Sequence, residues 1–230
     1  MTQKILLFLL LAGAVFTERS HASDEYNFSW LDPDKKIYVL QNRKFLKGDR
    51  AAISVMGGTA WSNSYRRTMS VDPRLAYYFN ETFGLEGFYT IFSNSENDTF
   101  KALQKSSPNA LPVVREIRAQ YGLLLHYVPW YAKINVYNSI LYFDWYFTGG
   151  AGQVAAAVDL RSKSSADPNY DYQNQFAFFL GTGHQYQLSR NFFIRLDYTA
   201  AVYQAYVDGI SGEKSWFSNS TFGIGGGVRF

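Results

Sequence analysis

Eight segments of this chain alternate apolar and polar side chains with a period of two, the spacing of residues on the two faces of a β-strand. Several segments run for about 11 to 14 residues. Strands of soluble proteins usually have roughly 5 to 6 residues, whereas a strand that crosses a membrane needs roughly 9 to 11. The pattern therefore favours an all-β fold whose strands are long enough to cross a bilayer. The predicted strands cover residues 50–61, 70–79, 83–93, 115–127, 139–151, 175–187, 192–204 and 217–230.

The connections between these segments alternate in length. Tight turns are predicted at residues 80–82 and 189–191, and an intermediate link at 128–138. Short turns on one side and long loops on the other are typical of outer-membrane barrels rather than of soluble β-sandwiches. We therefore expect residues 50–230 to form an eight-stranded antiparallel up-and-down transmembrane β-barrel. The longer, mostly polar links cover residues 62–69, 94–114 (with a short capped helix predicted at 98–104), 152–174 and 205–216.

The N-terminal residues 1–22 have the pattern of a signal peptide, with Lys4 before an apolar run at 5–16. That run is too short to span a bilayer as a helix, which needs roughly 20 residues. Residues 23–49 would then form a polar periplasmic segment that precedes the barrel. This segment is expected to lie against the barrel mouth. The alternative is that it serves as a docking strand for a periplasmic partner.

The chain ends in an alternating strand whose last residue is aromatic. An export signal combined with such an ending looks like a bacterial outer-membrane barrel, in which the final strand resembles the signal read by the insertion machinery. The sequence therefore predicts location in the bacterial outer membrane, with membrane lipid and the insertion machinery as partners. The predicted insertion signal comprises Phe222, Ile224, Val228 and Phe230.

Charged residues recur on the predicted inward face of the strands. A sheet in lipid must close on itself, because every backbone polar group needs a hydrogen-bond partner. Eight strands enclose a space that side chains can fill, so we expect a neutralising charge network there, with solvated pore lining as the alternative. The predicted network comprises Asp72, Arg74, Glu86, Arg118, Asp144, Arg195, Asp197 and Arg229.

Composition and histidine positions give little support to catalysis. The chain has no cysteine, which excludes disulfides and thiolate metal sites, and its formal net charge of +3 gives no case for nucleic acid. Of its three histidines, His21 lies in the predicted signal peptide, His126 is predicted to face inward, and His184 to face lipid. Neither of the last two accompanies a nucleophile-elbow motif. The sequence predicts no catalytic residue, no metal site and no cofactor.

Several motifs carry a family resemblance. They are FSWLDPDKKIYVLQNR at residues 28–43, Phe143-Asp144, TGGAG at 148–152, GTG at 181–183 and RLDY at 195–198. Together they resemble a Gram-negative family of outer-membrane β-barrel domain proteins, across nearly the whole chain after residue 22. The resemblance implies the fold and the location, and it implies no activity.

These observations predict an integral outer-membrane protein with a non-enzymatic role, either structural in the envelope or in interactions at the surface. Two alternatives stay open. One is a lipid-modifying outer-membrane enzyme, and the other is a narrow pore for small solutes.

Overall fold

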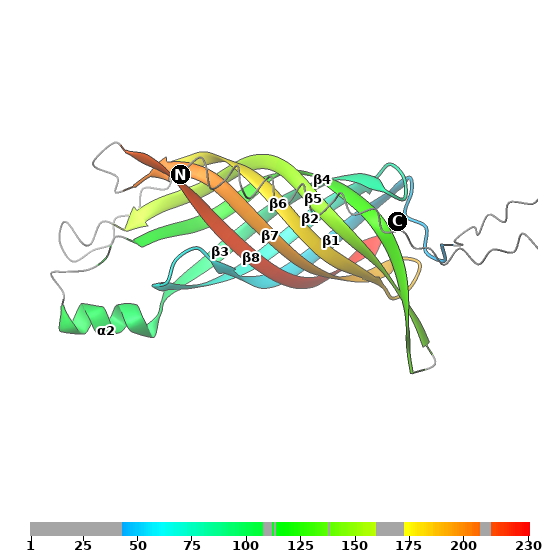
Figure 1. Ribbon diagram of the computed structural model, residues 1–230, viewed down its shortest axis with the longest axis horizontal. Helices are drawn as coiled ribbons and strands as arrows, with labels where there is room; N and C mark the ends of the chain where they lie inside the picture. The colour runs from blue at the N-terminus through cyan, green and yellow to red at the C-terminus, as the bar shows by residue number, and fades with distance from the viewer. Residues whose placement is uncertain (1–42, 108–111, 113, 138, 160–172, 208–212) are drawn as a thin grey trace, which may run out of the picture. The chain divides into compact units, whose positions relative to one another are not determined.

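The computed structural model describes residues 43–107, 112, 114–137, 139–159, 173–207 and 213–230. Eight antiparallel strands form a closed barrel in chain order, which confirms the predicted fold (Figure 1). No helix in the described ranges is long and apolar enough to span a membrane. The elements are β1 (Arg50–Trp61), β2 (Arg66–Tyr78), β3 (Phe83–Glu96), α2 (Asp98–Ser106), β4 (Val114–Val136), β5 (Ser139–Asp159), β6 (Gln173–Gln187), β7 (Phe192–Tyr206) and β8 (Lys214–Arg229).

The last strand pairs with the first and closes the barrel. The β1–β8 ladder runs from Ala52 opposite Arg229 to Trp61 opposite Ser220. The backbones of Ala51 and Phe230 then exchange two further hydrogen bonds, of 3.2 and 3.0 Å. Each strand therefore has two neighbours, and the barrel wall presents no open edge to lipid.

Side chains alternate between the interior and the outer wall as the period of two predicts. All 13 residues of β2 alternate between buried and exposed. Asp72 and Arg74 are buried inside, while Leu75 and Tyr77 are exposed on the outer wall. An outer wall of exposed apolar side chains would be unfavourable in water and is suited to contact with lipid.

The intermediate link predicted at 128–138 is wrong, because β4 continues through it as far as Val136 and the chain turns at Tyr137, whose φ is 44°. The continued strand contains Pro129, although proline normally ends a central strand. Here it lies at a register shift between Tyr127 and Trp130, where no ladder partner is required. Beyond this shift β4 and β5 continue to pair with each other, as far as Val136 opposite Ser139, and form a long hairpin.

Arg118 does not face the interior as predicted. In the β4–β5 ladder Ile117 pairs with Ala156 and Ala119 pairs with Ala155, so Arg118 is the additional residue of a β-bulge. Its side chain is exposed on the outer wall, and Ile117, predicted to face outward, is buried inside. A bulge changes which face successive residues occupy, and counting by twos along the sequence cannot detect it.

The helix α2 follows β3 in the second long loop, as predicted for residues 98–104. Asn97 caps it, since its side chain accepts a hydrogen bond of 2.9 Å from the Phe100 amide. The Phe100 ring is buried, and the guanidinium of Arg66 lies 4.8 Å from its centroid. The helix is thus anchored to the rim at the long-loop end of the barrel.

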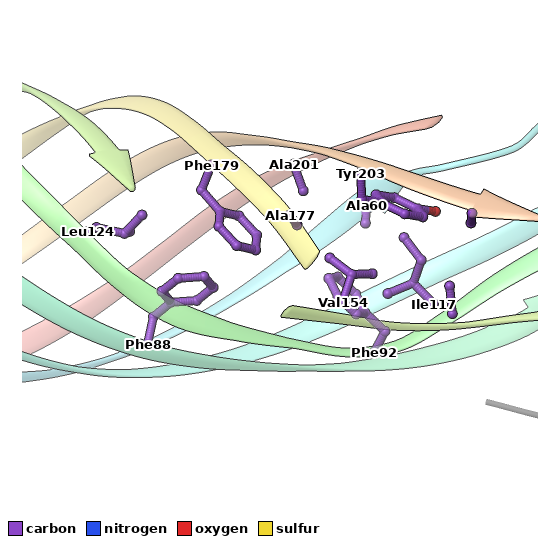
Figure 2. Close-up of a cluster of buried hydrophobic side chains, with 12 residues drawn as sticks. Ala60, Phe88, Phe92, Ile117, Leu124, Val154, Ala177, Phe179, Ala201 and Tyr203 are labelled. Carbon is purple, nitrogen blue, oxygen red and sulfur yellow. The ribbon is translucent and has the colours of Figure 1, made fainter. Parts of the chain in front are cut away.

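An apolar core fills part of the barrel interior (Figure 2). The rings of Phe88 from β3 and Phe179 from β6 meet edge to face, with centroids 4.9 Å apart. Small side chains such as Ala177 and Ala201 leave room for them. The core comprises Ala60, Phe88, Phe92, Ile117, Leu124, Val154, Ala156, Ala177, Phe179, Ala201, Tyr203 and Ala205.

Candidate functional site in the barrel interior

Two arginines and three carboxylates form a central ion network inside the barrel. Glu86 bridges the arginines, with its Oε1 2.7 Å from Arg74 Nη1 and its Oε2 2.6 Å from Arg195 Nη1. Asp197 Oδ2 also lies 2.9 Å from a guanidinium nitrogen of each arginine. Asp72 Oδ2 accepts a 2.9 Å hydrogen bond from Arg74 Nε. All five side chains are buried, and each lies within 2.9 Å of a group of opposite charge where water is excluded.

Strand geometry explains why these residues meet. Asp72 and Arg74 lie two residues apart on β2, and Arg195 and Asp197 two apart on β7, so each pair points to one face. Tyr146 on β5 accepts a 3.0 Å hydrogen bond from Arg195 Nε. The network therefore joins strands on different sides of the barrel and ties them together through side chains.

Gly183 on β6 makes room for the central ion network. A Cβ atom at this position would collide with the Tyr146 hydroxyl and with the Asp197 carboxylate. Because any larger residue would displace a member of the network or its neighbour, glycine here serves close packing of the polar interior.

A second group, the mouth cluster, lies at the short-turn end and comprises Lys47, Asp144, Gln187 and Arg229. Lys47 Nζ lies 3.0 Å from Asp144 Oδ2, and Gln187 Nε2 donates to the same oxygen at 3.2 Å. Gln187 Oε1 accepts a 3.0 Å hydrogen bond from Arg229. Burial lowers the pKa of Lys47, and the charge of Asp144 opposes that effect.

Glu81, in the β2–β3 turn, holds the segment that carries Lys47. Its Oε1 accepts hydrogen bonds from the amides of Lys47 at 2.9 Å and Gly48 at 2.8 Å. Arg43 Nη1 lies 3.4 Å from its Oε2. Residues 43–49 therefore lie against the barrel mouth. The rest of the predicted periplasmic segment, residues 23–42, and the predicted signal peptide, residues 1–22, lie outside the described residues.

The structure buries seven of the eight charged residues predicted to face inward, and Arg118 is the exception. Those seven comprise three cations and four anions. Lys47 supplies the fourth cation, and sequence reasoning missed it because the segment before β1 shows no strand periodicity. Without Arg118, the inward set has one more carboxylate than it has cations. This excess of negative charge is the signal that could have indicated a further cation.

A third charged group lies at the long-loop end, where Arg66 contacts both Glu116 and Glu96. This group was also missed, since residues 62–69 were predicted as a loop. Arg115, on β4, donates to the Tyr206 carbonyl, and its guanidinium lies 4.1 Å from the Phe217 ring centroid. Charged and aromatic side chains thus occupy the barrel interior at this end as well.

The histidines show no catalytic arrangement in the described structure. His126 is buried in the interior, with its ring stacked 4.2 Å from that of Tyr146, and neither ring nitrogen has a hydrogen-bond partner among the described residues. His184 lies on the outer wall, 5.4 Å from the Trp145 ring. No cluster of three or more metal-ligating side chains occurs among the described residues.

The four residues of the predicted insertion signal form one exposed row on the outer face of β8. Phe222, Ile224, Val228 and Phe230 are all exposed. Val228 and Phe230 border an apolar groove of about 630 Å³ on the outer wall, with Phe192 on its other side. Their recognition by the insertion machinery stays a prediction.

Most of the chain is similar to a known protein family. A family model described as "Outer membrane protein beta-barrel domain" matches residues 47–230, so the match starts at Lys47. The opening motif noted at residues 28–43 falls outside it. No curated protein matches the chain.

Solved structures of small outer-membrane barrels are also similar. The N-terminal β-barrel domain of Pseudomonas aeruginosa OprF is 12% identical, covering 80% of this chain and 98% of that one, with a TM-score of 0.48. OprG of the same organism is 13% identical, covering 82% and 99%, with a TM-score of 0.45. Ail, the attachment invasion locus protein of Yersinia pestis, is 16% identical, covering 79% and 97%, with a TM-score of 0.43.

Proposed function

The chain belongs to the outer membrane protein β-barrel domain family, and we propose that it is a non-enzymatic envelope protein that acts through its ends and outer surface. Its location is the bacterial outer membrane. The observation that carries the proposal is the filled interior, in which the central ion network and the apolar core leave little free space. A role in envelope structure or in surface interaction fits a barrel of this kind.

The interior argues against the narrow pore. A cavity beside Asp72 and Asp197 measures about 10 Å³, which is about the room that one water molecule needs. The rings of Phe88 and Phe179 meet inside the barrel. Conduction would require these layers to separate, and the ion pairs between strands oppose that separation.

The positions of the histidines argue against a lipid-modifying enzyme. Such an enzyme needs a nucleophile and a base within hydrogen-bond reach of each other at the membrane surface. His126 points into the barrel and away from lipid, while His184 packs among aromatic rings, including Trp145. The family match assigns neither a substrate nor a reaction.

Two measurements on the purified and the overexpressed protein test the proposal. Folded protein, verified by a shift in gel mobility on boiling, should give no steady conductance in planar bilayers. Overexpression should leave the mass of lipid A unchanged. Steady conductance would establish a pore, and altered lipid A would establish an enzyme, so either result would overturn the proposal.

A variant and a deletion strain complete the design. The double variant Phe88→Ala/Phe179→Ala removes both rings from the core and serves as an opened control for the conductance assay. A deletion strain should show increased sensitivity to detergent, or reduced surface binding, relative to its parent. The wild-type gene should restore the parental detergent resistance and surface binding to the deletion strain. If Phe88→Ala/Phe179→Ala restored them equally well, the filled interior would be unimportant for the role.

A further inference from the structure

The β4–β5 hairpin continues past its neighbouring strands at the short-turn end. Pairing of β4 with β3 ends at Tyr127, and pairing of β5 with β6 ends at Tyr142. Beyond these residues β4 and β5 pair only with each other in the described structure, as far as Val136 opposite Ser139. Figure 1 shows the two green strands swinging away from the barrel at this end. We call residues 128–141 the periplasmic hairpin.

The outward face of the periplasmic hairpin is apolar and continues the lipid-facing wall. Between Leu123 and Tyr127 the outward residues of β4 have odd numbers, and the register shift before Trp130 changes them to even numbers. Trp130, Ile134 and Val136 are therefore outward, with exposed fractions of 51%, 47% and 43%. Leu141 lies opposite Ile134 on the same face. Without the shift, these apolar side chains would point toward the barrel axis.

The opposite face is covered by the chain itself near the barrel. The ring of Phe45 meets that of Tyr142 edge to face at 5.5 Å, and Tyr142 stacks with Tyr131 at 5.9 Å. The guanidinium of Arg43 lies 5.2 Å from the Tyr131 ring centroid, and the Lys44 amide donates to the Tyr131 hydroxyl at 3.3 Å. Residues 43–45 therefore cover this face at Tyr131 and Tyr142, whereas Lys133, Asn135 and Ile140 nearer the tip are exposed. Because this face carries a charge at Lys133, the outward face is the more apolar of the two.

We propose that the periplasmic hairpin lies on the inner leaflet of the outer membrane, with its outward face against phospholipid. Three observations support this occupant. The face is continuous with the lipid-contacting wall, its even-numbered β4 positions from Trp130 to Val136 carry no charge, and Trp130 packs 5.1 Å from Trp145. Paired tryptophans are typical of membrane interfaces, where one side is apolar and the other wet.

The free edges of the periplasmic hairpin limit how deep it can lie. Backbone N–H and C=O groups on the outer edge of residues 130–136 have no neighbouring strand within the described part of the chain. Such groups cannot enter hydrocarbon unpaired, but headgroups and interfacial water can satisfy them. The hairpin therefore lies at headgroup depth, as an extension of the membrane contact beyond the barrel wall. This inference concerns membrane contact and does not depend on the proposed function.

The absence of cysteine from the sequence makes a labelling experiment direct. Single substitutions Ile134→Cys and Val136→Cys place a nitroxide on the outward face, and Lys133→Cys and Asn135→Cys place it on the opposite face. Full-length folded protein is measured in vesicles of phosphatidylethanolamine and phosphatidylglycerol. The probes are collisions with oxygen, which concentrates in lipid, and with a water-soluble nickel chelate.

The expected result is an alternation with a period of two. The oxygen-to-nickel collision ratio should be several-fold higher at positions 134 and 136 than at 133 and 135. Leu123→Cys on the lipid-facing wall and Lys101→Cys on α2 provide the lipid and water references. Water-like ratios at both 134 and 136 would overturn the proposal. Immobilisation of those labels only when periplasmic extract is added would also overturn it, in favour of a peptide partner.

A charge variant provides the second arm. Ile134→Asp/Val136→Asp should move a nitroxide at Ala132→Cys from lipid-like to water-like ratios, while Asn135→Asp on the opposite face should not. Unchanged mobility shifts on boiling show that the barrel is intact in each variant. An unchanged ratio in Ile134→Asp/Val136→Asp would contradict a lipid-held hairpin.

Discussion

The ammonium group of Lys47 lies 3.0 Å from the carboxylate of Asp144, although Lys47 precedes the first strand and Asp144 lies on the fifth. Both side chains are buried in the barrel mouth. The pair joins the segment before the barrel to the barrel interior. Lys47 is also the fourth inward cation. Together with the three inward arginines it balances the four carboxylates of the central ion network and the mouth cluster.

Replacing Lys47 should therefore destabilise the barrel. Lys47→Met leaves Asp144 buried without its cation, and breaking a buried pair in this way costs about 3 to 5 kcal/mol. The measurement is urea unfolding in lipid vesicles. Lys47→Met/Asp144→Asn removes both charges and should recover part of the loss. A double variant as unstable as the sum of the two single variants would show that the ion pair has no coupling.

The central ion network should respond in the same way to loss of its bridging carboxylate. Glu86→Gln removes one of the two carboxylates that Arg74 and Arg195 share, the other being Asp197, and should cost about 3 to 5 kcal/mol by the rule for buried pairs. Glu213→Gln, at an exposed carboxylate before β8, should change stability by less than about 0.5 kcal/mol. Equal effects of the two substitutions would contradict the structural role of the network.

Much of this fold could be predicted because apolar and polar residues alternate with a period of two along each strand. This alternation indicates which side chains face lipid and which face the interior. Asp72, Arg74 and Glu86 face inward as counted, since no bulge interrupts the strands that carry them. The sequence could not show that Glu86 meets Arg195, because the two are 109 residues apart and their contact depends on barrel closure and register.

The errors have specific physical causes. Arg118 faces outward because a bulge changes the phase of β4, and Pro129 is tolerated because a second register shift removes the need for its amide. Lys47 was missed because its position depends on hydrogen bonds that the backbone amides of Lys47 and Gly48 donate to Glu81, rather than on strand periodicity. Each of these features depends on contacts between segments distant in the sequence, which a pattern along one strand does not contain.

The lipid-facing wall should show a depth-dependent cost of charge. Leu123 is exposed on β4 between Arg118 and Tyr127, and Leu123→Arg near the membrane midplane should cost about 2 to 4 kcal/mol. Tyr127→Arg, near the short-turn interface, should cost about 0 to 1 kcal/mol. Reversible unfolding in vesicles measures both. Equal costs would place the membrane elsewhere along the barrel.

The inward Gln120 gives a separate test of facing. Gln120 is buried inside the barrel, so Gln120→Arg carries no cost of transfer to lipid, although it can disturb the interior. It should be less destabilising than Leu123→Arg in the same unfolding assay. The opposite order would contradict the inward facing of Gln120 and the outward facing of Leu123.

Gly183 should not tolerate even a methyl group. Gly183→Ala drives a Cβ into the Tyr146 hydroxyl and the Asp197 carboxylate, and overpacking of this kind costs about 1 to 3 kcal/mol. Gly226→Ala is the matched control, because its Cβ would lie 3.6 Å from the nearest atom, the Phe193 carbonyl oxygen, on the outer wall. A loss at Gly226 as large as that at Gly183 would assign the effect to strand backbone rather than to interior packing.

Phe230 allows recognition by the insertion machinery to be separated from anchoring in lipid. Its backbone pairs with Ala51 through two hydrogen bonds, so Phe230→Ala removes the ring and keeps the barrel closure. Phe192→Ala is the matched control, because Phe192 borders the same outer groove and is 57% exposed against 62% for Phe230.

If the ring of Phe230 is recognised during assembly, both variants should fold equally well into synthetic bilayers, and only Phe230→Ala should lose outer-membrane assembly in cells. If the ring is only an interfacial anchor, the two variants should lose similar stability in both settings, since aromatic rings at the membrane interface contribute in the same way wherever they lie. The measurements are folding yield in vesicles and the amount of heat-modifiable protein in outer-membrane fractions. Wild-type assembly of Phe230→Ala in cells would remove the insertion-signal prediction for this residue.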